Sequence, residues 1–213
     1  TSTSVSQVKF RPEKGTITFV TKQHQDKTNG VYEISLNGGE ATKVYSHDKG
    51  NILSYDWSKD GSQLAIITME QATAPKTSLT YSPIFFEESY NLRNAYIVKD
   101  NVALKLNVDG SAYMIAWNHN GQEIAVSTAP TGAVDDEYIK QTIKIVNTQT
   151  RNVVANVDNK GKLGQFVWSP DNQSIAIVGA FDINDPTNGS LLIVSNKGGK
   201  PKVIDGNYLG KYE

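Results

Sequence analysis

The serines and histidines of this sequence could support nucleophilic or metal chemistry, so their surroundings are the first indication of function. Serine hydrolases place their nucleophile in a Gly-x-Ser-x-Gly motif, and no serine here has glycine both two positions before and two after it. The three histidines, His24, His47 and His119, stand in predicted loops or turns, and their spacing gives no His-x-x-x-His pair for a metal ion. We therefore expect three surface histidines, and a chain with no catalytic residues, no cofactor and no metal ion.

The acidic clusters are the other candidates for chemistry. Asp135, Asp136 and Glu137 are consecutive, and such a run is usually a solvated tip, with amine binding as the alternative. The loop 181–189 has the composition of a calcium loop but lacks its ligand spacing and its closing glutamate. The Gly-Gly pairs lie between predicted strands with no helix following, which excludes a phosphate loop of the usual kind.

Composition excludes several classes of protein. A net charge of −1 gives no electrostatic reason to expect nucleic-acid or membrane binding, and no apolar run approaches the roughly 20 residues that span a bilayer. The absence of cysteine excludes disulfides and thiolate metal sites. The first residues lack the features of a signal peptide. Either the protein is periplasmic or secreted and its leader has been removed, or it is cytoplasmic.

These residues must be positioned by a segment that recurs four times. Each copy begins with an anchor aromatic, and all three tryptophans of the chain occupy this position: Phe10, Trp57, Trp117 and Trp168. Seven residues later comes an aliphatic residue: Ile17, Leu64, Ile124 and Ile175. A small residue follows directly: Thr18, Ala65, Ala125 and Ala176. The spacing of the anchors, 47, 60 and 51 residues, is that of a structural repeat.

Each copy reads as a strand, a tight turn and a second strand. Pro170 presets the first corner of a type I turn, and Asn172, Gly61 and Gly121 fit the left-handed position that follows such a turn in a hairpin loop. Gly15 comes one place later, which predicts a shifted turn in the first copy. The second strands, such as 64–67 and 175–178, are almost continuously apolar, so we expect them to be covered on both faces.

Repeats of this length built from strands and turns predict an all-β protein, a β-propeller of about four four-stranded blades that is incomplete or open. The anchor aromatics would then pack between blades. The chain would form a single propeller segment, whose blades we place near 5–47, 51–108, 111–158 and 164–205, with the start of a further blade at 207–213.

The second blade carries a long insert, 69–94, which is unusual in a compact domain. Its candidate docking residues are aromatic and acidic: Tyr81, Phe85, Phe86, Glu87, Glu88 and Tyr90. Residues 85–94 could form a short helix. The insert is either an extended hairpin that covers its own blade or a lid or docking arm for a partner.

Trp57-Ser58-Lys59-Asp60-Gly61 and Trp168-Ser169-Pro170-Asp171 resemble the repeat of TolB-like propellers and of the propeller domain of prolyl oligopeptidase-family serine peptidases. The Trp117 copy keeps only the tryptophan and glycine, and the Phe10 copy is the most degenerate. True WD repeats differ, because they close a strand with Trp-Asp.

The peptidase resemblance implies a non-catalytic propeller that gates or docks on a missing C-terminal hydrolase domain of the dipeptidyl or acylaminoacyl type, with peptides as substrates. A TolB-like propeller would instead bind protein or glycan partners in the periplasm. A carbohydrate-active propeller enzyme is a third possibility, although the polar clusters it needs are scarce. An open arc would also expose its terminal faces, which predicts a homodimer or aggregation.

Overall fold

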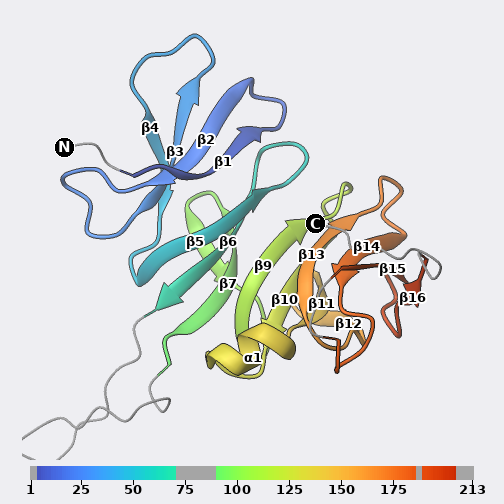
Figure 1. Cartoon of the computed structure of the whole chain (residues 1–213). Coiled ribbons are helices and arrows are strands. Elements are labelled where there is room, and N and C mark those ends of the chain that lie inside the picture. Colours follow the sequence, from blue (N-terminus) through green and yellow to red (C-terminus); the bar gives the residue numbers. More distant parts are fainter. Residues whose placement is uncertain (1–3, 71–89, 186–188, 205–213) are drawn as a thin grey trace, which may run out of the picture.

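The computed structural model describes residues 4–70, 90–185 and 189–204 as four antiparallel, four-stranded sheets (Figure 1). Neighbouring sheets pack face to face along an arc, with the first and fourth sheets at opposite ends (Figure 1). The predicted all-β fold of four blades is therefore confirmed, and over the described residues it is consistent with an open or partial propeller.

In every sheet the strands follow one another in chain order from the inside outward. The first sheet contains β1 (Ser6–Arg11), β2 (Thr16–Thr21), β3 (Gly30–Ser35) and β4 (Thr42–Ser46). The second contains β5 (Gly50–Trp57), β6 (Leu64–Glu70), β7 (Leu92–Lys99) and β8 (Val102–Lys105). The third contains β9 (Ser111–Trp117), β10 (Glu123–Ala129), β11 (Thr142–Asn147) and β12 (Val153–Asn156). The fourth contains β13 (Leu163–Trp168), β14 (Ser174–Gly179), β15 (Ser190–Ser195) and β16 (Lys202–Val203).

The repeat read from the sequence is a repeat of strand register. In all four sheets the anchor aromatic of the first strand is the cross-strand partner of the aliphatic residue seven positions later: Phe10 with Ile17, Trp57 with Leu64, Trp117 with Ile124 and Trp168 with Ile175. The equal spacing arises because each hairpin has the same loop length, which fixes the register.

The hairpin turns are held by side chains of the Trp-Ser-x-Asp motif. Ser58 Oγ donates to Asp60 Oδ1 at 2.6 Å and accepts the Gln63 N–H at 2.9 Å. Ser169 and Asp171 repeat this arrangement in the fourth sheet. Hydrogen bonds, first from Ser58 and then from Ser62, lower the pKa of Asp60 to about 2, so its carboxylate is charged throughout the physiological range.

The residues predicted from the sequence to have a left-handed backbone conformation do so in the structure. Gly61, Gly121 and Asn172 have φ values of 65°, 73° and 62°. In the shifted first copy both Glu13, with a φ of 57°, and Gly15, with a φ of 61°, occupy this region. Glycine and asparagine adopt this conformation at low cost, which explains their presence at these corners.

Burial of the second strands depends on the place of the sheet in the arc. In β6 both faces are buried, since Leu64 and Ile66 belong to a core shared with the first sheet and Ala65 and Ile67 to one shared with the third. In β14 buried and half-buried residues alternate instead. The prediction of a doubly covered strand is therefore right for β6 and wrong for β14, where the structure describes no sheet beyond the fourth.

Candidate functional site

The inner strands β1, β5, β9 and β13 border a groove of about 620 Å³ along the inside of the arc. A propeller's innermost strands line its axis, where ligands commonly bind. The polar side chains of the groove come from all four sheets: Gln7, Lys9, Ser54, Asp56, His119 and Gln165.

Asp56 holds the floor of this groove together. Its carboxylate accepts a hydrogen bond from Lys9 Nζ at 3.0 Å and another from the backbone N–H of Trp117 at 2.9 Å. One half-buried side chain of β5 therefore links β1 on one side with β9 on the other. Hydrogen bonds to a charged acceptor are stronger than neutral ones, which suits Asp56 to a role in fixing the arc.

The exposed groups of the groove are suited to binding. Gln7 and Gln165 are exposed, and an amide side chain both donates and accepts hydrogen bonds. Val167, also exposed, adds an apolar surface on β13. Amide and apolar groups together match an extended ligand such as a peptide or an oligosaccharide.

The anchor tryptophans lie between sheets and not in an open cavity. Trp57, Trp117 and Trp168 are each 6% exposed, and each belongs to a core shared with the preceding sheet. The indole N–H of Trp57 donates to Thr18 Oγ1 at 3.0 Å, and that of Trp168 donates to the Ala116 carbonyl at 3.1 Å.

The anchor of the first sheet differs from the three tryptophans in its exposure. Phe10 is 72% exposed, because it stands on the outer face of the first sheet and the structure describes no sheet before it. Its neighbour Arg11 points the other way and places its guanidinium 4.2 Å from the ring of Trp57.

His47 corrects the expectation of three surface histidines. His24 and His119 are exposed, but His47 is only 5% exposed, because the connection from β4 to β5 turns inward between two sheets. Its Nδ1 lies 3.1 Å from the Tyr45 hydroxyl, and its ring centre is 4.8 Å from that of Tyr96. Desolvation lowers the pKa of His47, and the imidazole is therefore neutral at pH 7.

The prediction that the acidic run 135–137 is a solvated tip is also wrong. It lies in the short helix α1 (Val134–Ile139), where Asp135 is exposed but Asp136 is buried. Asp136 accepts hydrogen bonds at 2.7 Å from both Thr131 Oγ1 and Lys140 Nζ, and the bond from Lys140 is the main cause of its lowered pKa. The four-residue spacing of Asp136 and Lys140 was a sequence signal for this helix.

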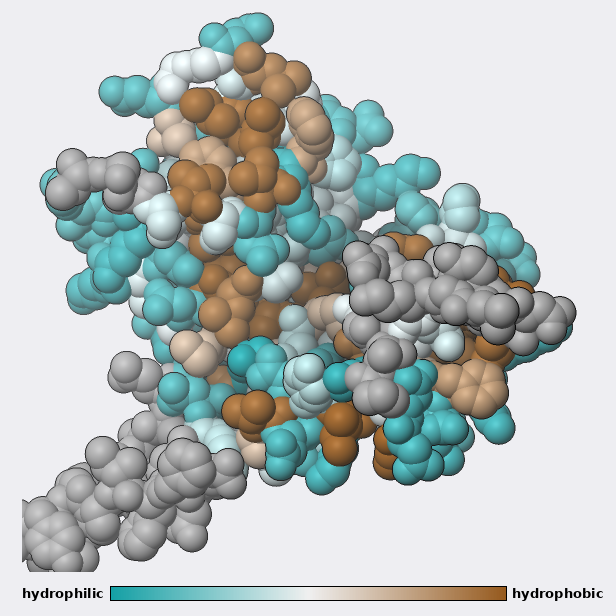
Figure 2. All heavy atoms as spheres, in the orientation of Figure 1, coloured by the Kyte–Doolittle hydropathy of each residue, from teal (hydrophilic) through white to brown (hydrophobic). Residues whose placement is uncertain are grey.

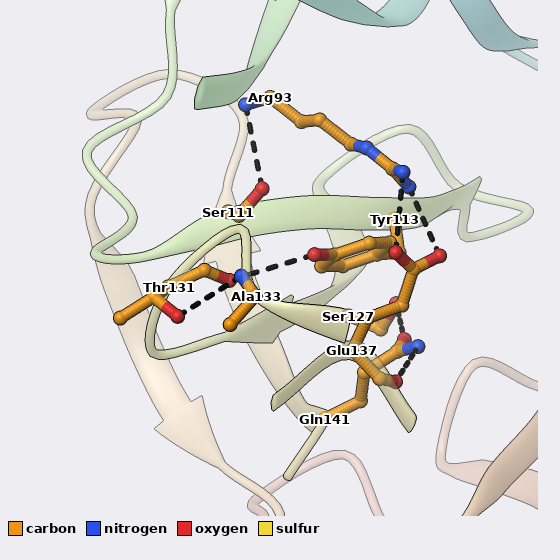
Figure 3. A network of polar contacts seen from close by, with 8 residues as sticks. All are labelled: Arg93, Ser111, Tyr113, Ser127, Thr131, Ala133, Glu137 and Gln141. Carbon is orange, nitrogen blue, oxygen red and sulfur yellow. Dashed lines mark hydrogen bonds and ion pairs between the residues drawn. The ribbon is translucent and has the colours of Figure 1, made fainter. Parts of the chain in front are cut away.

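Glu137 belongs to a second network, which joins α1 to β7 and β9 (Figure 3). Both of its carboxylate oxygens face the guanidinium of Arg93, at 3.3 and 3.2 Å. The same guanidinium lies 4.2 Å from the ring of Tyr113. Because Arg93 stands near the start of β7, this network joins the start of that strand to α1.

The candidate docking residues of the insert lie mostly outside the described residues, namely Tyr81, Phe85, Phe86, Glu87 and Glu88. Tyr90 is described and half-buried, and it lies against Gly132, where an added Cβ would come within 2.8 Å of the Tyr90 Cβ. The short helix predicted for 85–94 is wrong for its last residues, because β7 begins at Leu92.

The structure gives the calcium-like loop a local role over its described part, 181–185. Asp182 Oδ1 accepts the backbone N–H of Asn184 at 2.7 Å and that of Asp185 at 3.1 Å, which is an Asx turn. Among the described residues, no three His, Asp or Glu side chains gather closely enough to hold a metal ion. Within the same residues, no helix has the length and apolar character needed to cross a membrane.

No protein-family model matches this sequence, and a search of curated proteins also gives no match. Solved structures do match, and β-propellers are among them. The β-propeller domain of the trilobed protease from Pyrococcus furiosus, described as having an open velcro topology, has a TM-score of 0.58 at 14% identity and covers 96% of this chain. A chain of a nidogen/laminin complex has a TM-score of 0.60 at 12% identity over 95% of this chain, and an oligogalacturonate lyase in complex with manganese has 0.55 at 15% over 94%.

This chain spans 58% of the protease propeller, 65% of the nidogen/laminin chain and 47% of the lyase. At these identities the likeness defines the class of fold, a β-propeller, and nothing finer.

Proposed function

We propose that this chain is a non-catalytic β-propeller segment of a prolyl oligopeptidase-family serine peptidase, of the dipeptidyl or acylaminoacyl type. It would gate or dock on a C-terminal hydrolase domain that supplies the nucleophile. The Trp-Ser-x-Asp turns support this family, since their serine and aspartate hydrogen-bond each other and hold the hairpins. The likeness to the propeller domain of a protease adds support at the level of the fold.

The observation that carries the proposal is the chemistry of the axial groove. Its carboxylate, Asp56, is occupied by Lys9 and by a backbone N–H, and its exposed groups are the amides of Gln7 and Gln165. Such amides bind the N–H and C=O groups of a peptide without reacting with them. A peptide held along the groove would lie on the axis of the arc, where a propeller can admit or exclude it.

Peptide binding can be measured through tryptophan fluorescence, because Trp117 and Trp168 border the groove. We expect short unstructured peptides to produce a saturable change. Gln165→Ala should weaken binding about fivefold, the equivalent of one hydrogen bond of ~1 kcal/mol. Gln149→Ala, at another exposed glutamine in the turn between β11 and β12, serves as the matched control and should leave binding unchanged. Absence of saturable binding would contradict a peptide-gating groove.

The non-catalytic role has its own test. The chain alone should not hydrolyse chromogenic dipeptide or acylaminoacyl substrates. Hydrolysis that increases with the concentration of the chain and stops after treatment with a serine-directed fluorophosphonate would overturn this part of the proposal. The family assignment further requires that DNA beyond the codon for residue 213 encodes a Gly-x-Ser-x-Gly motif.

A TolB-like propeller that binds protein or glycan partners in the periplasm is the second candidate. The same groove favours it, because the exposed amides of Gln7 and Gln165 also suit the hydroxyl groups of sugars. Saturable binding of cell-wall oligosaccharides but not peptides, or co-purification with an envelope protein, would select this function. We propose that the protein is periplasmic or secreted, with the cytoplasm as the alternative, and cell fractionation would separate these locations.

A further inference from the structure

Neighbouring sheets pack through one repeated pattern, in which an aromatic row on one sheet meets a row centred on a small residue on the sheet before it. At the two ends of the arc, one row of each kind is exposed. On the face turned toward the preceding sheet, the anchor aromatic heads a row of three cross-strand partners. These rows are Trp57–Leu64–Val98, Trp117–Ile124–Val146 and Trp168–Ile175–Val194, and all nine side chains are buried.

The first sheet has the same row of cross-strand partners, but its side chains are not buried. Its members are Phe10, Ile17 and Ile34, paired in the same register. Phe10 is highly exposed, and the other two are half-buried. Figure 2 shows apolar residues gathered on the surface of the first sheet, at the top of the view. A row built like three interface rows, but open to solvent, is an interface row without its partner.

On the face turned toward the following sheet, each sheet presents a second row of cross-strand partners, which we call the socket. Each is centred on the small residue of the repeat, as in the rows Asp56–Ala65–Ile97 and Ala116–Ala125–Ile145, and it receives the indole of the following sheet. On the fourth sheet the row is Val167–Ala176–Ile193. No following sheet is described there, and Val167 is 59% exposed.

We propose that these two ends pack against each other between two copies of this chain, with Phe10 of one copy entering the socket around Ala176 of the other. The argument for a second copy is that the chain already forms this interface three times in the same register. The exposed aromatic row and the exposed socket are therefore complementary surfaces of one molecule. The contact would continue the stacking of sheets from one copy into the next.

Such a contact is heterologous, since one end meets the other end and not itself. It closes into a ring when the rotation between copies allows, and otherwise extends as a chain of copies. This property separates it from a symmetric contact in which two first sheets meet.

Sedimentation velocity of the chain over a range of concentrations tests the proposal. We expect association that rises with concentration. Phe10→Glu or Val167→Glu, each placing an unpaired carboxylate in an apolar contact, should weaken it about tenfold or more. Val154→Glu is the matched control, because Val154 is 56% exposed on the outer strand β12 and away from both ends. It should leave association unchanged.

Mixing the two variants gives the sharper result. The Val167→Glu copy keeps its Phe10, and the Phe10→Glu copy keeps its socket, so one intact interface remains between them. We expect a one-to-one complex that grows no further. Circular dichroism should first show that both variants are folded, which is expected because both positions are exposed. A wild-type chain that stays monomeric at every concentration, or a mixture that does not associate, would overturn the proposal.

A disulfide trap provides a second measurement, because the chain has no cysteine of its own. Oxidation of a mixture of Phe10→Cys and Ala176→Cys chains should give the mixed dimer. Dimers of Phe10→Cys with itself in preference to the mixed product would show that the first sheets meet symmetrically, which contradicts the head-to-tail contact.

Discussion

Ala65→Ser should stabilise this protein, although it places a polar group at a fully buried position. The indole N–H of Trp117 is buried and has no hydrogen-bond partner among the described residues. The equivalent N–H of Trp57 donates to Thr18 Oγ1 at 3.0 Å. Ala65 is the residue of β6 that corresponds to Thr18, and it belongs to the same core as Trp117 but has no hydroxyl. A serine at this position would supply the missing acceptor.

The expected magnitude follows from the cost of an unpaired donor. A buried N–H without a partner costs about 1–3 kcal/mol, and part of a new bond is offset by burying the hydroxyl. We expect a net gain of ~1 kcal/mol in the free energy of unfolding, which corresponds to about 2–4 °C in Tm for a chain of this size.

Ala125→Ser is the matched control for this change. Ala125 occupies the same position one sheet further on, beside Trp168, whose N–H already donates to the Ala116 carbonyl. A hydroxyl there has no unpaired indole to satisfy, so the same substitution should cost about 1–3 kcal/mol.

Urea unfolding of the two variants and the wild type is the assay, with m-values compared to ensure that the unfolding transition is the same. Opposite signs for Ala65→Ser and Ala125→Ser support the reasoning. An equal loss of stability in both variants would refute it, because the cost of burying the hydroxyl would then exceed any benefit to Trp117. Trp117→Phe should also cost about 1 kcal/mol less than Trp57→Phe, since only the latter breaks a hydrogen bond.

Two further predictions concern the turns and the buried imidazole. Gly121→Ala should cost ~1 kcal/mol for its left-handed φ, whereas Gly61→Ala should cost more in the same thermal melts, because its Cβ would lie 2.2 Å from the Pro12 carbonyl oxygen; equal losses would show that this contact relaxes freely. Burial lowers the pKa of His47 in the folded state, so the unfolded chain binds its proton first, and stability should fall as the pH drops from about 6.5 toward the lowered pKa. Urea unfolding at several pH values should show this slope reduced in His47→Gln but kept in His119→Gln, and an unchanged slope in both would exclude His47 as its source.

Much of the fold could be predicted because the repeat encodes register. A strand, a turn of fixed length and a second strand place the anchor and the residue seven positions later opposite each other, so a sequence alignment of four segments is also an alignment of four hairpins. The turn residues were readable for a related reason. Left-handed positions admit few residue types, and Gly61, Gly121 and Asn172 stand at them.

The candidate site was less predictable, because burial depends on neighbours that are distant in sequence. His47 follows an exposed hairpin in the chain, and nothing near it indicates that Tyr96 of another sheet covers its ring. Glu137 is one of three adjacent acids, and its partner Arg93 lies 44 positions away. The groove itself combines residues of four sheets, so no local pattern could have shown that Lys9 and Gln165 border one cavity.

The disagreement between β6 and β14 is the most informative of these failures. Leu64–Ile67 and Ile175–Val178 have the same continuously apolar character, and in β6 both faces are covered while in β14 one is not. A strand with one solvated face normally alternates between apolar and polar residues, which β14 does not do. Its outward residues have the composition of an interface, and so does the Phe10 row at the other end of the arc. The apolar residues on the uncovered face of β14 are therefore evidence for a contact beyond the fourth sheet. If the ends of the arc remain open in solution, Ala176→Glu should change neither the oligomeric state nor the fold, whereas a covered socket predicts loss of association without loss of the fold.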